Sequence, residues 1–290
     1  MKKLKQIIHQ IKNLPEEKAE ELEQLLWPYI CYSPKMPLRL VQEQLLQDAE
    51  TISLTVYDEF FAGRELAFHA FRWGNGKVKV LLTHGWGSKA ADFNELITAL
   101  ATLEDLEIIA FDAPGNGSSE GELSNLLLFK LAVQAVVKHY GHPDVLIGHS
   151  LGAMANVFAL GDMEVKPALL ISITPLVRLK ENFQASMDAL HIAPASQAAF
   201  FKGFQEKFNV SASSFTLDNL YAFDEQLNHW MAFDSSDEIS PYPYLREFLV
   251  HHPSVQAKDY KDVGHSKAIK SAEVIADILA RVESVLKLKS

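Results

Sequence analysis

The chain has 290 residues, of which 48% are hydrophobic and 22% are charged, and its net charge is −10. This length suffices for one large α/β domain, or for such a domain with an inserted segment. The acidic balance argues against nucleic acid as the main partner, because phosphate binding depends on clustered Lys and Arg. The single cysteine, Cys31, excludes an internal disulfide and a cysteine zinc site.

The N-terminus begins with the basic residues of Met1–Lys5, but polar residues interrupt the stretch where a signal peptide needs an apolar core. No stretch approaches the ~20 apolar residues that a membrane-spanning helix requires. We therefore expect a cytoplasmic protein without a membrane span.

The first 50 residues predict a helical extension. Residues 4–14 have apolar side chains at helical spacing. Pro15 opens a second predicted helix, with Glu16 and Glu17 in its first turn, and Pro28 ends it. We interpret the two helices as a packing arm or as the contact of a homodimer.

From residue 51 onward the pattern alternates between strands and helices. The predicted strands are Ile52–Val56, Leu66–Trp73, Val78–Thr83, Leu106–Phe111, Asp144–Ile147, Ala168–Ile173, His229–Phe233 and Val255–Tyr260. The predicted helices are Leu38–Glu50, Ala90–Leu103, Leu123–Tyr140, Leu151–Leu160, Tyr242–Leu249 and Ala272–Leu288. Continuous apolar strands separated by helices predict a mostly parallel central sheet with helices on both faces.

The alternation stops at Pro175, and the following stretch has helical patches but no clear strand. We interpret residues 176–225 as a helical cap inserted into the α/β core. The predicted division is therefore an N-terminal helical extension (1–50), a core (51–175 and 226–290) and this cap.

The loops after the predicted strands carry the residues suited to chemistry, since parallel strands end at one edge of the sheet. One loop is Gly148-His149-Ser150-Leu151-Gly152, between a predicted strand and a predicted helix. A Gly-x-Ser-x-Gly sequence in this setting is typical of a nucleophile elbow, in which a sharp turn presents the serine. The glycines let the two elements approach closely.

The remaining loops supply partners for acyl transfer. A serine hydroxyl such as that of Ser150 needs an adjacent base, and His265, after the last predicted strand, is the candidate. A carboxylate must orient that imidazole; Asp237 is the first choice and Asp234 the alternative. The order Ser, Asp, His along the chain is the one that this architecture uses.

An oxyanion requires backbone N–H donors. Leu151, which follows the serine, and Trp86, in a His-Gly-Trp-Gly loop, are the candidates. The residues expected to support the elbow and this loop are His84, Gly85, Gly148, His149 and Gly152.

In these features the chain resembles the α/β-hydrolase fold superfamily over residues 52–288. The resemblance is carried by five ordered motifs, His84-Gly85-Trp86-Gly87, Asp112-Ala113-Pro114-Gly115-Asn116-Gly117-Ser118, Gly148-His149-Ser150-Leu151-Gly152, Asp237-Glu238-Ile239-Ser240-Pro241 and Gly264-His265. It implies a serine nucleophile at Ser150, an acid at Asp237 and a base at His265. Phe233-Asp234 stands where the family usually has His-Gly, so the register of the acid stays open.

The predicted cap is rich in aromatic residues, namely Phe183, Phe200, Phe201, Phe204, Phe208, Phe215, Tyr221 and Phe223. We expect many of them to pack the cap onto the core and some to line the path to Ser150. This favours hydrolysis of a small-molecule ester with an apolar acyl group. A thioesterase, an amidase or a cofactor-free perhydrolase would use the same residues, and a ligand-sensing protein on the same fold is the alternative from another class. We expect no metal and no cofactor, since Ser-His-Asp chemistry needs neither.

Overall fold

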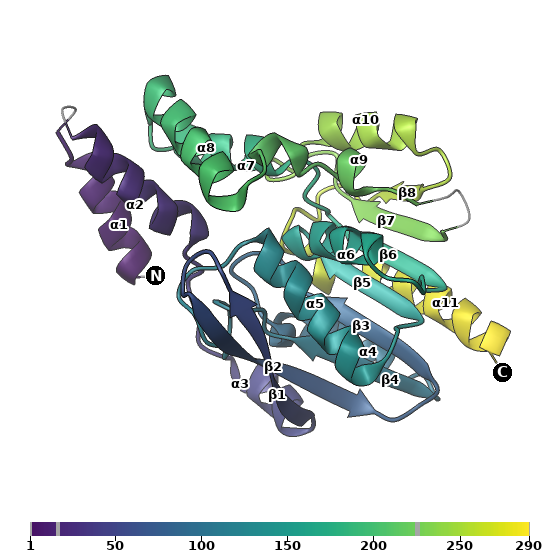
Figure 1. The fold of residues 1–290 in the computed structure, drawn as a ribbon. Coiled ribbons are helices and arrows are strands. Elements are labelled where there is room, and N and C mark those ends of the chain that lie inside the picture. The colour runs from purple at the N-terminus through teal and green to yellow at the C-terminus, as the bar shows by residue number, and fades with distance from the viewer. Residues whose placement is uncertain (1, 16–17, 224–226, 290) are drawn as a thin grey trace.

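The computed structural model describes residues 2–15, 18–223 and 227–289. At its centre lies an eight-stranded sheet in the order β1-β2-β4-β3-β5-β6-β7-β8 (Figure 1). The strands are β1 (Glu50–Asp58), β2 (Arg64–Gly74), β3 (Val78–Thr83), β4 (Leu106–Phe111), β5 (Val145–His149), β6 (Leu169–Ile173), β7 (His229–Phe233) and β8 (Gln256–Asp259). β1, β2 and β4 pair antiparallel, and β3 to β8 pair parallel, which confirms the predicted sheet.

The α-helices are α1 (Lys2–Lys12), α2 (Ala19–Cys31), α3 (Leu40–Gln47), α4 (Asn94–Leu100), α5 (Leu126–Tyr140), α6 (Leu151–Gly161), α7 (Leu179–Asp188), α8 (Pro194–Phe208), α9 (Leu217–Leu220), α10 (Tyr242–His251) and α11 (Ala272–Lys289). Short 3₁₀ turns occupy η1 (Ala90–Phe93), η2 (Ala212–Ser214) and η3 (Ala268–Lys270). Helix α5 begins three residues later than predicted, because the Asn125 side chain caps it by accepting a hydrogen bond from Leu128 N (2.9 Å).

Helices cover both faces of the sheet, and alternate residues of a strand pack against the helices on opposite faces. In β5, Leu146 packs in the core beneath α5 and α6, whereas Val145 and Ile147 pack in the core beneath α4 and α11. Every residue of β5 and β6 is buried, as the continuous apolar runs predict. Helices α5 and α6 lie in front of the sheet in Figure 1, and α11 lies behind it.

Helix α2 does not end at Pro28 as predicted but continues to Cys31. A proline inside a helix removes one backbone hydrogen bond and costs about 3 kcal/mol. The residues around Pro28 compensate for this cost, because Leu26, Ile30 and Cys31 are all buried in one apolar cluster. Packing between distant segments, which local sequence does not reveal, therefore decides where the helix ends.

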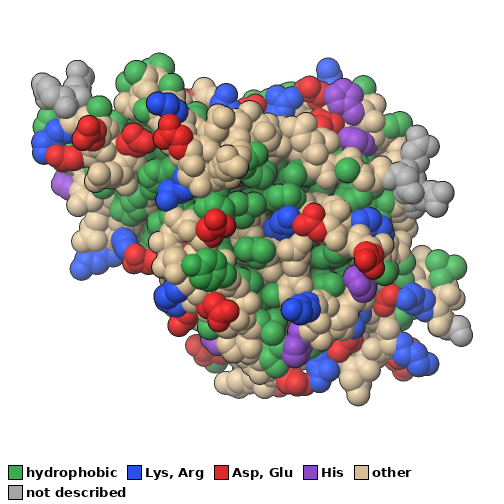
Figure 2. Space-filling model, viewed as in Figure 1, with side chains coloured by type: hydrophobic (Ala, Val, Ile, Leu, Met, Phe, Trp, Pro, Cys, Tyr) green, Lys and Arg blue, Asp and Glu red, His purple; other side chains and the backbone are tan. Residues whose placement is uncertain are grey.

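The N-terminal arm, which we define as α1 and α2, packs against the segment between β6 and β7 (Figure 1). The Trp27 ring lies 4.8 Å from the ring of Phe200 on α8, and Leu26 is completely buried. Figure 2 shows apolar side chains gathered across this face between the arm, α8 and α5. The predicted positions of Glu16 and Glu17, and the predicted end of the cap at residues 224–225, lie outside the described residues. The division into extension, core and cap stays a prediction.

We expect Leu26→Ala to lower the free energy of unfolding by about 2–5 kcal/mol, because it removes a fully buried side chain from the contact between the arm and α8. Urea denaturation followed by tryptophan fluorescence measures the change. Gln24→Ala, on the exposed side of the same helix, is the control and should unfold like the unmodified protein. Equal midpoints for the two variants would show that the arm is not part of the cooperative fold.

Candidate active site

Ser150 stands at the turn between β5 and α6 with φ of 52° and ψ of −120°. A residue other than glycine rarely adopts positive φ, and such strain persists only where the surroundings hold it. Hydrogen bonds to neighbouring backbone groups stabilise this conformation. Ser150 N donates to Ile173 O at the end of β6 (3.0 Å), and Ser150 O accepts from Leu176 N (3.1 Å).

The glycines of the elbow stand where no side chain fits. A Cβ at Gly152 would lie 2.3 Å from the carbonyl oxygen of Thr83 in β3, and one at Gly148 would lie 2.5 Å from Cα of Ala153. Each distance is far below a normal contact with backbone atoms. The sequence Gly-x-Ser-x-Gly is therefore required for α6 to approach the ends of β3 and β5.

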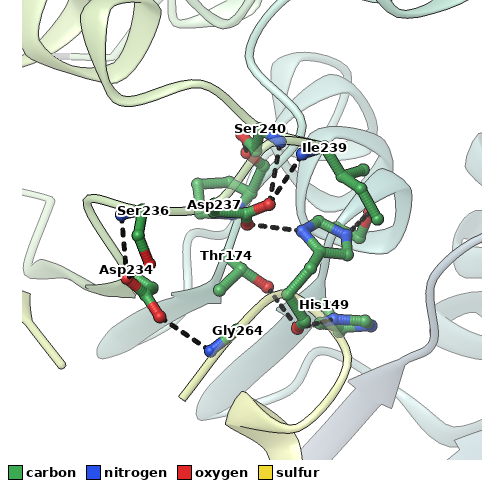
Figure 3. A network of polar contacts seen from close by, with 11 residues as sticks. His149, Thr174, Asp234, Ser236, Asp237, Ile239, Ser240 and Gly264 are labelled. Atoms are coloured by element: carbon green, nitrogen blue, oxygen red, sulfur yellow. Dashed lines mark hydrogen bonds and ion pairs between the residues drawn. The ribbon is translucent and has the colours of Figure 1, made fainter. Parts of the chain in front are cut away.

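Ser150, His265 and Asp237 form a continuous hydrogen-bonded series. His265 Nε2 lies 2.8 Å from Ser150 Oγ, and His265 Nδ1 lies 2.6 Å from Asp237 Oδ2. The other carboxylate oxygen of Asp237 accepts from the backbone N–H groups of Ile239 (2.8 Å) and Ser240 (3.1 Å), as Figure 3 shows. The carboxylate is thereby fixed in position toward the imidazole.

Asp234, the alternative acid in the sequence, faces away from the imidazole. One of its carboxylate oxygens accepts from Ser236 N (2.9 Å), and the other accepts from Gly264 N (2.7 Å) (Figure 3). Burial acts to raise the pKa of Asp234, but these hydrogen bonds outweigh it and hold the pKa below its usual range. Asp234 thus anchors the residue that precedes His265, and Asp237 contacts the ring itself.

The backbone carbonyl of His265 is held from the opposite side by two donors. His149 Nε2 and Thr174 Oγ1 each lie 3.1 Å from it, so the neutral His149 ring carries its proton on Nε2. Thr174 follows β6 with a φ of 40°. The sequence analysis missed Thr174, and its one local signal is its place directly after a buried strand.

The two proposed oxyanion donors border the same cavity as Ser150. Leu151 is the first residue of α6, so its N–H has no partner within the helix. The loop that carries Trp86 is fixed by the buried His84, whose Nδ1 donates to Gly85 O (2.7 Å) and whose Nε2 accepts from Ala113 N (2.9 Å). Burial lowers the pKa of His84, which keeps its ring neutral for these two bonds.

A cavity of about 780 Å³ opens beside Ser150 and His265. Its lining includes the aliphatic side chains of Leu4, Ile30, Leu126, Leu176, Val177, Leu179, Ile239 and Ile269, and the aromatic side chains of Tyr29, Tyr32, Trp86, Phe183 and Tyr244. Of the eight aromatic residues singled out in the sequence, Phe183 lines the cavity, and Phe200, Phe204 and Phe208 are buried in packing between helices. Of these eight residues, one therefore reaches the cavity; the other aromatic residues in the lining, Tyr29, Tyr32, Trp86 and Tyr244, lie outside the predicted cap.

No helix among the described residues combines the length and the apolar character needed to cross a membrane. The same residues contain no group of three or more His, Cys, Asp or Glu side chains placed to hold a metal ion.

We expect the free energy of unfolding to fall as the pH drops from about 6.5 toward 4. Burial lowers the pKa of His149 and of His229 to about 3, so both stay neutral in the folded protein. In the unfolded chain they titrate near 6.5, and that state therefore binds more protons across this window and gains stability from them. Each histidine contributes on the order of a few kcal/mol, measurable by urea denaturation at a series of pH values.

Carboxylates also contribute to acid sensitivity, so the comparison rests on variants. His149→Asn should show a shallower dependence on pH between 6.5 and 4 than the unmodified protein. His142→Asn removes an exposed histidine and should leave the dependence as it is. A His149→Asn curve parallel to that of His142→Asn would contradict the depressed pKa.

The sequence was compared with known proteins. Its residues 80–278 match the alpha/beta hydrolase family. The chain is 30% identical over 125 residues to monoglyceride lipase of Rattus norvegicus, covering 40% of this chain and 41% of that one. It is 28% identical over 170 residues to the pimeloyl-[acyl-carrier protein] methyl ester esterase of Aeromonas hydrophila, covering 56% and 63%. The chain thus spans less than two thirds of the length of either relative.

Among solved structures, an esterase from Pyrococcus furiosus has a similar fold. The two share a TM-score of 0.59 at 18% identity, over 89% of this chain and 97% of that one. At this identity the likeness concerns the fold alone. The family match spans most of the sheet, the whole elbow and the loops that surround it. The chain therefore belongs to the alpha/beta hydrolase family.

Proposed function

We propose that the protein is a serine hydrolase that cleaves the carboxylic ester of an apolar acyl group through an acyl-enzyme intermediate. The observation that carries this proposal is the pair of short hydrogen bonds joining Ser150 to His265 and His265 to Asp237 beside an apolar cavity. The geometry matches what an activated serine needs, namely a base within hydrogen-bond reach and a carboxylate that orients the base.

In the acylation step, Ser150 Oγ attacks the ester carbonyl carbon and its proton passes to His265 Nε2. Asp237 holds the Nδ1 proton and stabilises the imidazolium that forms. His265 then returns the proton to the departing alcohol as the tetrahedral intermediate collapses to the acyl-enzyme. In the second step the same imidazole takes a proton from a water molecule, whose oxygen attacks the acyl carbon. The proton then returns to Ser150 Oγ as the ester bond to the enzyme breaks, which releases the acid and restores Ser150.

The negative charge on the former carbonyl oxygen needs donors in place before the reaction. In this proposal the N–H of Leu151 and the N–H of Trp86 supply them. The Leu151 N–H also lies at the N-terminal end of α6, where the helix dipole favours an anion. The bonds of His84 to Gly85 and Ala113 hold the Trp86 loop to the loop after β4, which limits reorganisation during the reaction.

The substrate class follows from the cavity and from the relatives together. One relative is named for a monoglyceride and the other for a methyl ester. Both names fit an ester with a small alcohol, and the aliphatic side chains in the cavity lining, such as Leu4, Ile30 and Leu176, fit the acyl part. A volume of about 780 Å³ is within the range of sites that enclose a whole small molecule.

We expect Ser150→Ala to lower the kcat for chromogenic acyl esters by about 10⁴-fold or more, because the nucleophile is lost. The same panel should include acyl thioesters and amides, whose relative rates define the leaving group. A fluorophosphonate probe should label the unmodified protein and leave Ser150→Ala unlabelled. A folded protein that neither labels nor turns over any ester would favour the ligand-sensing alternative instead.

The two aspartates should differ in effect. Asp237→Asn should lower kcat by about 10³–10⁴-fold, because a neutral amide cannot stabilise the His265 imidazolium and its NH₂ group favours the wrong tautomer of the ring. Asp234→Asn should lower kcat by roughly ten- to a hundredfold through a displaced Gly264, with KM nearly unchanged. Steady-state kinetics on one ester decides between them. A larger loss of kcat in Asp234→Asn than in Asp237→Asn would show that Asp237 is not the acid of the triad.

A further inference from the structure

The N-terminal arm lies outside the residues that match the family, yet it reaches the cavity beside Ser150. The first part of the chain contributes Leu4, Tyr29, Ile30, Cys31, Tyr32 and Pro34 to the cavity lining. Leu4 comes from α1, and Tyr29 to Cys31 come from the last turn of α2. The sequence pattern of these helices predicts a packing or dimer role and gives no sign of a contact with the cavity.

The arm is fixed to the segment between β6 and β7, which forms another side of the cavity. Tyr29 Oη donates to the carbonyl of Ser186 on α7 (2.8 Å), and the Trp27 ring contacts Phe200 on α8. Ile7 and Ile11 of α1 are buried in the same cluster as Phe200. The arm and α7–α8 therefore form one packed unit over the cavity.

The arm is also tied to the body of the protein just after α2. Ser124 N donates to Cys31 O (2.8 Å), and Tyr32 pairs with Leu123 in an isolated bridge. Lys3 forms an ion pair with Glu122 from the side of α1. With attachments to both the body and α7–α8, the arm holds its lining side chains at fixed places.

We propose that the N-terminal arm is a wall of the acyl-binding cavity and limits the length of acyl chain that the protein accepts, with Leu4 as the contact from α1. The inference rests on the proposed function, since it assigns the acyl part of the substrate to this cavity. The wall is suited to a hydrocarbon chain, because Leu4, Ile30 and Cys31 present apolar groups. Burial raises the pKa of the Cys31 thiol to about 12, so the thiol is uncharged.

The experiment compares Leu4→Trp with Lys12→Trp, a matched substitution at an exposed position of the same helix that does not line the cavity. The kcat/KM of each is measured on p-nitrophenyl esters from acetyl to palmitoyl. If the larger side chain excludes roughly two or three methylene groups, each worth about fourfold, the longest accepted esters lose about 15- to 60-fold. Acetyl and butyryl esters should keep their rates within about twofold. Lys12→Trp should follow the unmodified profile throughout.

A binding measurement separates this inference from the proposed function. In the Ser150→Ala background, saturated fatty acids of increasing length are titrated by calorimetry, with and without Leu4→Trp. Loss of affinity confined to the longer acids supports the wall even if no ester is turned over. The inference would be overturned if affinity depended on acid length in the same way in Leu4→Trp and Lys12→Trp, provided that both proteins are folded and have equal unfolding midpoints. This holds whatever the outcome with esters.

Discussion

The strained turn at Ser150 depends on how closely α6 approaches the ends of β3 and β5. Gly148 and Gly152 allow that approach, and two hydrogen bonds hold the positive φ, one from Ser150 N to Ile173 O and one from Leu176 N to Ser150 O. The next strand ends continue the same pattern, since Thr174 N donates to Ala232 O (2.7 Å) and Tyr260 N to Phe233 O (2.7 Å). The loops that carry Asp237 and His265 are thus positioned relative to Ser150 through the backbone of the sheet.

The His265 loop is held through the backbone of two successive residues, Gly264 and His265. Asp234 binds Gly264 N on one side, and Thr174 and His149 bind the His265 carbonyl on the other. The position of the imidazole matters for proton exchange with a serine, because a misplacement of about 1 Å can cost roughly a hundredfold in rate. Two carboxylates that are three residues apart therefore serve different purposes, one toward the backbone and one toward the ring.

The succession of strands along the chain, and the meeting of the residues that follow them, could be predicted from the sequence, because parallel strands bring their C-terminal ends to one edge. Ser150, His265 and Asp237 meet as this rule requires. The sequence favours Asp237 over Asp234 but leaves the register of the acid open, since that register depends on the turn geometry after β7. The course of α2 past Pro28, and the contacts of Thr174, depend on packing between distant segments, and no local pattern records them.

The elements that surround the cavity divide into two groups with different sequence constraints. Ser150 and His265 lie within the matched family core, where the elbow tolerates few alternatives because backbone atoms crowd its glycines. Leu4 and Ile30 lie on helices outside the matched residues, where the demand is mainly apolar packing, which many side chains satisfy. Substitutions there change the shape of the cavity at little cost to the elbow. The proposed acyl chemistry and the proposed limit on chain length can therefore vary independently, since separate contacts maintain each.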